Sequence, residues 1–83
     1  MEVKILGTGC PNCKRLEKIA REALAEMSIE ATVTKVTNFS DIMSYDILTT
    51  PGLVIDGKVV SSGRVPSKAE VTSLITTALS EAG

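Results

Sequence analysis

The 83-residue sequence contains no histidine and no tryptophan, and it has only two cysteines. Without histidine, a cysteine–histidine catalytic pair and a histidine-ligated zinc site are both excluded. Two cysteines are too few for a small scaffold held together by disulfides. Nine basic residues against ten acidic ones give a net charge of −1, so binding of nucleic acid through a basic surface is not expected.

Long apolar runs are also missing. The longest stretch without a charged residue is 71–80, ten residues, whereas a membrane-spanning helix needs about 20. Glu2 and Lys4 interrupt the N-terminal segment, so it lacks the apolar core of a signal peptide. The 43% hydrophobic and 23% charged residues are typical of a soluble globule. We expect a single domain over residues 1–83 that is monomeric and cytoplasmic, with no membrane or nucleic-acid contact.

Strand and helix signals alternate along the chain. Residues 3–6 form a β-rich run, and apolar residues then recur at helical spacing from Cys13 to Met27, with Pro11 suited to the first turn and Cys10 to the N-cap. The other predicted elements are a strand over 31–36, a short helix from Asn38 to about Tyr45, a hairpin of strands 53–55 and 58–60 around an Asp56–Gly57 turn, and a final helix over 67–80 that begins with a Ser67–Glu70 capping box. The order βαβαββα predicts an α/β fold with a four-stranded mixed sheet and helices on both faces. In it the first two strands are parallel and the hairpin extends the same sheet.

The motif that carries chemistry is Cys10-Pro11-Asn12-Cys13. Two cysteines three positions apart in a first helical turn have Cα atoms about 5 Å apart, which permits an intramolecular disulfide. Cys10 lies outside the helix, where free N–H groups and the positive helix end favour a thiolate and lower its pKa; Lys14 and Arg15 add positive charge. Cys13 begins the apolar stripe, so it is expected to be more buried and slower to react. This asymmetry suits a nucleophile and a resolving thiol.

Two other interpretations of the cysteine pair are a structural disulfide and a pair of inert core thiols. A three-residue loop constrains the unfolded chain little, so it makes a poor structural link. Inert thiols do not require a glycine-flanked helix tip that begins with proline. A redox-active dithiol is therefore the favoured interpretation, and metal binding is the main alternative.

Thr50–Pro51 is the second informative position. A proline in a β-region belongs at a strand start or at an edge, and Pro51 stands just before the strand 53–55. Taken alone, a trans bond is the better expectation, since only about 5–6% of X–Pro bonds are cis. The combination of a CxxC motif after the first strand with a proline at the head of the third changes that balance.

These features together resemble the thioredoxin superfamily, and in particular its small glutaredoxin-sized members from archaea and bacteria. The resemblance covers nearly the whole chain and rests on the strand 3–6, Gly9-Cys10-Pro11-Asn12-Cys13, Thr50-Pro51-Gly52 and the hairpin 53–60. It implies a thioredoxin-like fold and a thiol–disulfide oxidoreductase. Cys10 is then the nucleophile that attacks a partner disulfide, and Cys13 resolves the mixed disulfide by forming a Cys10–Cys13 disulfide.

The resemblance also implies how partners bind. In this family the proline at the place of Pro51 is cis and packs beside the cysteines, and the backbone at the place of Thr50 binds extended substrate as an added strand. Pro11 and Asn12 are expected to contribute to the same substrate-binding surface. Disulfide-containing proteins are the implied substrates, and a thioredoxin reductase-like flavoenzyme is the implied electron donor. No cofactor and no metal are expected.

Several other residues stand out without pointing to chemistry. Lys4 occupies the first-strand position where thioredoxins keep a buried acid, and 61–64 replaces the glutathione-binding segment of glutaredoxins. Phe39 and Tyr45 are the only aromatic residues, and both are expected to pack over the sheet. Arg64 is expected to be a solvated surface residue.

A soft-metal carrier is the rival function. Two thiolates suit Cu(I), and small heavy-metal-binding domains also place a CxxC between a first strand and a first helix. Those domains resemble a βαββαβ order and usually carry Met two residues before the first cysteine. This chain has Thr8 there and ends its predicted elements with a helix. An iron–sulfur carrier, in which two chains bridge a cluster through Cys10, is a further alternative.

Overall fold

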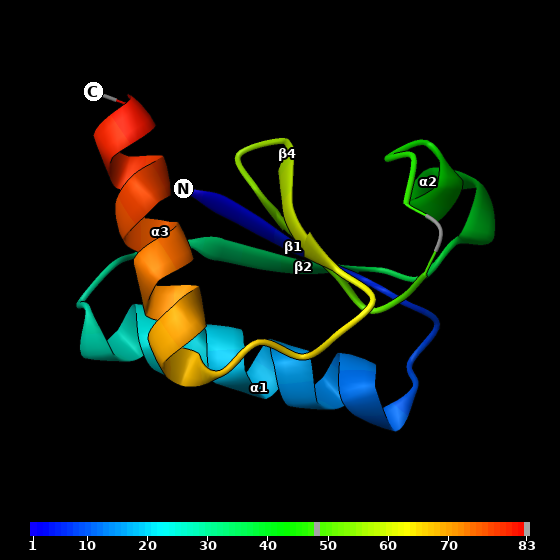
Figure 1. The fold of residues 1–83 in the computed structure, drawn as a ribbon, viewed down its shortest axis with the longest axis horizontal. Coiled ribbons are helices and arrows are strands. Elements are labelled where there is room, and N and C mark those ends of the chain that lie inside the picture. Colours follow the sequence, from blue (N-terminus) through cyan, green and yellow to red (C-terminus); the bar gives the residue numbers. More distant parts are fainter. Residues whose placement is uncertain (48, 83) are drawn as a thin grey trace.

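The computed structural model of the protein describes residues 1–47 and 49–82. Within these residues, strands and helices follow the predicted order βαβαββα (Figure 1). The elements are β1 Glu2–Leu6, α1 Pro11–Glu26, β2 Thr32–Val36, α2 Phe39–Met43, β3 Gly52–Ile55, β4 Lys58–Ser62 and α3 Lys68–Ala82. The predicted element order is therefore confirmed.

The strands form one mixed sheet in the order β2-β1-β3-β4 across the described residues. β1 pairs with β2 in parallel, and β3 runs antiparallel to both β1 and β4, so the hairpin extends the sheet as predicted. The hairpin turns at Asp56 and Gly57, whose φ angles are +49° and +84°. Both angles are positive, as a type I′ turn requires.

Helices α1 and α2 begin where their caps predict. Cys10 is the N-cap of α1 and Pro11 its first helical residue, a position at which proline loses no hydrogen bond. Asn38 caps α2, because its side-chain oxygen accepts from the backbone N–H groups of Ser40 at 2.8 Å and Asp41 at 3.3 Å. Local side chains therefore fix both helix starts.

Helices cover both faces of the sheet. Side chains alternate along the strands, so Ile5 and Leu53 join the core that α1 and α3 cover, while Leu6 and Val54 join the core beside α2. α1 and α3 pack against each other on their shared face (Figure 1). Among the described residues, none of the helices combines the length and the apolar character needed to cross a bilayer.

Two local predictions need correction. Phe39 does not pack over the sheet; its side chain is 70% exposed. A five-residue helix has room for few inward-facing side chains, and Ile42 takes that place in α2. At the start of α3, Ser67 Oγ accepts from the Glu70 N–H at 3.2 Å, which is half of the predicted capping box. The Glu70 carboxylate accepts instead from both terminal nitrogens of Arg64.

Candidate functional site

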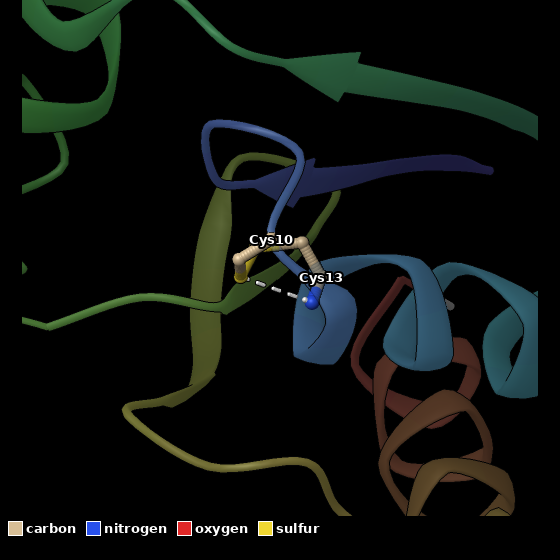
Figure 2. Close-up of a disulfide and its surroundings, with 2 residues drawn as sticks. All are labelled: Cys10 and Cys13. Atoms are coloured by element: carbon tan, nitrogen blue, oxygen red, sulfur yellow. Dashed lines mark hydrogen bonds between the residues drawn. A yellow bond between two sulfur atoms is a disulfide. The ribbon is translucent and has the colours of Figure 1, made fainter.

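The two cysteines lie at the junction of β1 and α1 (Figure 2). They form a disulfide with a Cα–Cα distance of 5.1 Å. Cys10 has extended backbone angles and precedes the helix, and its Sγ accepts from the Cys13 backbone N–H at 3.3 Å. The sulfur of Cys10 therefore takes the place that a serine or aspartate oxygen takes in an ordinary N-cap.

The two sulfurs sit in different surroundings. Cys10 is partly exposed, and Pro11 and Asn12 between the cysteines are exposed. Cys13 is only 5% exposed, because it starts the buried stripe of α1. The positive end of the α1 dipole, with the Cys13 N–H that donates to Cys10 Sγ and the charge of Lys14 next to it, makes this end of the helix electropositive. An incoming sulfur can reach Cys10 far more readily than Cys13.

Gly7 gives the Cys13 sulfur its room. It is buried directly after β1, and a Cβ at this position would overlap Cys13 Sγ and lie 3.2 Å from Cys13 Cβ. The same Cβ would lie 4.0 Å from Thr50 Cβ, so Cys13 and Thr50 flank one glycine. The sequence alone did not single out Gly7 as part of the site. The signal that could have done so is a glycine at the end of a buried strand, three residues before a cysteine.

The structure brings the segment before β3 to the same place. The Thr50–Pro51 peptide bond is cis; Thr50 is exposed and Pro51 is buried. The Pro51 carbonyl accepts from the Gly63 N–H at 2.9 Å. Gly63 has a φ of +79°, and a Cβ there would collide with Thr49 Oγ1. The segment at Thr50, distant from the cysteines in sequence, thus lies beside Gly7 and Cys13, and Gly63 contacts this segment.

Lys4 and Arg64 lie outside this site. Lys4 Nζ donates to the Tyr45 hydroxyl at 3.0 Å, on the face of the sheet beside α2. This hydrogen bond, and then the charge of Glu2, raise the pKa of Lys4. Arg64 is exposed, as expected, and its guanidinium is paired with Glu70. Both side chains are engaged in polar contacts with other residues.

The donors available to a metal are few. Cys10 and Cys13 could supply two thiolates, which are soft ligands. Among residues 1–47 and 49–82, no group of three or more His, Cys, Asp or Glu residues comes close enough together to hold a metal ion. Chemically, this arrangement offers two adjacent sulfurs that can form a disulfide or be reduced to two thiols.

Comparison with known proteins gives consistent results. A family model described as "Thioredoxin domain" matches residues 1–76. A thioredoxin of Methanothermobacter thermautotrophicus is 41% identical over 75 residues, which cover 90% of this chain and 97% of that protein. A thioredoxin of Methanocaldococcus jannaschii is 35% identical over 69 residues, covering 83% of this chain and 79% of that protein.

A solved structure supports the fold. Thioredoxin 1 from the thermophilic eubacterium Thermosipho africanus superimposes with a TM-score of 0.66 at 21% identity. The match covers 99% of this chain and 98% of that one. At this low identity the likeness is one of architecture, and it covers β1 through α3.

Proposed function

The chain belongs to the thioredoxin family and is a thiol–disulfide oxidoreductase, and we propose that Cys10 is its nucleophile and Cys13 its resolving thiol. The Cys10 thiolate attacks one sulfur of a substrate disulfide, and the other substrate sulfur leaves as a thiolate and takes up a proton. The Cys13 thiolate then attacks Cys10 Sγ. This second attack forms the Cys10–Cys13 disulfide and releases the remaining substrate thiol, so two electrons pass to the substrate.

The difference in exposure between the two sulfurs carries this assignment. A nucleophile has to meet a disulfide on another molecule, and Cys10 is partly exposed at the helix tip whereas Cys13 is buried. The resolving step occurs within one chain, so burial does not prevent it. The Cys13 N–H donates to Cys10 Sγ, and this donor together with the positive helix end favours the thiolate form of Cys10.

We further propose that substrates bind across the helix tip and the segment before β3. Pro11 and Asn12 offer exposed surface between the cysteines, and Thr50 is exposed beside Gly7. A substrate segment in extended conformation would pair with the Thr50 backbone and place its sulfur over Cys10. Pro51 is buried, and its ring supports this segment without adding a side chain that could ligate metal.

Thioredoxins act on disulfide substrates and are reduced again by thioredoxin reductase. For this chain we propose disulfide-containing proteins as substrates and a thioredoxin reductase-like flavoenzyme as the electron donor. We also propose that the reaction takes place in the cytoplasm. Its support is the cysteine usage: the two cysteines form one redox pair and leave none for a structural disulfide, and disulfides in reducing compartments are usually transient and catalytic.

The cysteine roles are tested by trapping. The Cys13→Ser variant should accumulate a mixed disulfide through Cys10 when mixed with a disulfide protein such as insulin, because the second attack is lost. The Cys10→Ser variant is the matched control, since it removes one thiol from the same motif. It should trap nothing. Adducts are read by non-reducing electrophoresis and assigned by mass spectrometry.

Trapping by Cys10→Ser instead of Cys13→Ser would reverse the two roles. If both single variants still reduce insulin, the two-step mechanism is wrong. If neither variant traps substrate while the wild-type protein binds Cu(I) tightly in a metal titration, the dithiol is a soft-metal site and the proposal fails.

A further inference from the structure

A small cavity adjoins the buried sulfur. Its volume is about 80 Å³, and its lining includes Cys13, Lys14, Glu17, Lys35 and Thr37. A water molecule occupies about 30 Å³ of the liquid, so the cavity has room for about two. Most of its lining surface is apolar, and the polar side chains among its lining residues are the partners available to such water.

Helix α1 carries Glu17 to this cavity, and strand β2 places Lys35 beside it. Glu17 follows Cys13 by four residues in α1, so both side chains lie on the same face of the helix. Lys35 is paired with Ile5 in the parallel register of β1 and β2, which places it on the face that α1 covers. The Glu17 side chain is only 18% exposed and makes ion pairs with Lys35 at 3.7 Å and Arg21 at 3.0 Å.

The resolving step requires Cys13 to lose a proton, because the thiolate and not the thiol is the nucleophile. Cys13 is 5% exposed, so bulk water has poor access to it. We propose that Glu17 accepts this proton through water in the cavity, an inference that rests on the proposed role of Cys13. Lys35 and Arg21 hold the carboxylate in position.

The proton and the electrons of the resolving step each have a defined destination. As the Cys13 S–H bond breaks, its proton moves through water to the Glu17 carboxylate, and the sulfur's electron pair forms the bond to Cys10 Sγ. The bond between Cys10 and the substrate sulfur breaks, and the substrate leaves as a thiolate. Glu17 then returns the proton to bulk water from its exposed edge. No oxidant beyond the substrate disulfide is consumed.

The charges around the cavity favour Glu17 for this role. α1 contributes Lys14 and Arg21, and β2 contributes Lys35. These cationic groups donate hydrogen bonds and have no lone pair with which to accept a proton. Their positive charge also offsets that of Glu17, so the carboxylate does not oppose the thiolate forming on Cys13.

The test separates attack from resolution in the reduced protein. The probe is an aromatic disulfide whose thiolate product is coloured. One thiolate is released when Cys10 attacks the probe, and a second is released when Cys13 resolves the mixed disulfide. Glu17→Gln should slow the second release on the order of 100-fold near neutral pH, at the low end of what a positioned base contributes, and leave the first unchanged. In Glu17→Gln the rate of the second release should also rise about tenfold per pH unit, because it then follows the fraction of Cys13 present as thiolate. The wild-type rate should not change with pH.

Glu22→Gln is the matched control, because it removes the same charge from an exposed position of α1 and should leave both releases as in the wild type. The unchanged first release shows that Glu17→Gln is folded. A solvent deuterium isotope effect on the second wild-type release alone provides a measurement that needs no variant. A wild-type rate and pH profile in Glu17→Gln, or no isotope effect, would overturn the role of Glu17. A wild-type protein that gives no second release would overturn the proposed role of Cys13 itself.

Discussion

At the scale of single residues, the packing around Cys13 depends on the absence of a side chain. Gly7 is buried between Cys13 and Thr50, and any Cβ there would enter the space of the Cys13 sulfur. Its φ does not fall in the left-handed region that favours glycine. Glycine is therefore required at this position for space and not for backbone conformation.

Gly7→Ala should lower the free energy of unfolding of the oxidised protein by about 1–3 kcal/mol, the usual cost of overpacking a core. It should also slow disulfide exchange, because Cys13 and the segment at Thr50 have to shift to admit the methyl group. Urea unfolding and the rate of insulin reduction measure the two effects.

Gly57→Ala serves as the control for this substitution. A methyl group at Gly57 would meet no atom within 4 Å, but the φ of this residue is +84°. Alanine there should cost about 1–2 kcal/mol through backbone strain and leave disulfide exchange unchanged. Equal exchange rates in both variants would contradict the account of Gly7.

At the scale of elements, α3 begins with a side-chain network that differs from an ordinary capping box. Ser67 Oγ satisfies the Glu70 N–H, while the Glu70 carboxylate binds Arg64, which lies before the helix. The hydrogen bond from Arg64 is the main cause that lowers the pKa of Glu70. The network ties the loop after β4 to the first turn of α3.

The pH dependence of this link follows from the direction of the shift. A carboxylate whose pKa is lowered by folding stabilises the folded state above its ordinary value of about 4.5, and this contribution is lost as the pH falls through the lower folded value. Glu70→Gln should therefore be modestly less stable than the wild type at pH 7, as expected for an exposed pair. The difference should shrink at an acidic pH below the lowered pKa of Glu70, where the carboxyl group is protonated in both the folded and the unfolded state.

Urea unfolding at the two pH values measures this difference. Glu30→Gln is the control, since Glu30 is an exposed residue outside the helices, and it should leave the stability unchanged at both. A Glu70→Gln deficit that persists unchanged in acid would show that the ion pair with Arg64 is not its source.

At the scale of the whole molecule, stability depends on α3 closing one face of the sheet. Val71 and Ile75 of α3 join the core formed with α1, β1 and β3, whereas the core beside α2 is smaller. A chain of 83 residues has an expected unfolding free energy of about 4–12 kcal/mol. Loss of one well-packed contact in the larger core therefore takes a large share of the total.

Ile75→Ala should lower the free energy of unfolding by about 2–5 kcal/mol, because Ile75 is 1% exposed and its removal leaves a cavity. Leu79→Ala, one turn later in the same helix, is the matched control. Leu79 is 45% exposed, so its replacement should cost less than about 1 kcal/mol. Urea unfolding of both variants checks this, and equal losses would refute the placement of α3.

Much of this architecture was determined by sequence alone, because its signals are local. The apolar spacing of Leu16, Ala20, Ala23 and Leu24 predicted the buried face of α1, and proline and cysteine fixed its start. Asp56 and Gly57 predicted the hairpin turn, since both can adopt positive φ. Residues within one turn of helix or one hairpin specify these features, so no distant contact was needed to predict them.

Tertiary structure decided what lies around the sulfurs. Spacing predicted that Cys13 is more buried than Cys10, but only the pairing of β1 with β2 and β3 brings Lys35 and Thr50 to this end of the sheet. The exposure of Phe39 and the pairing of Arg64 with Glu70 likewise escaped prediction. The physical reason is common to all of them: helical and strand periodicity determine which side of an element a residue faces, whereas its neighbours depend on how elements distant in the sequence pack together.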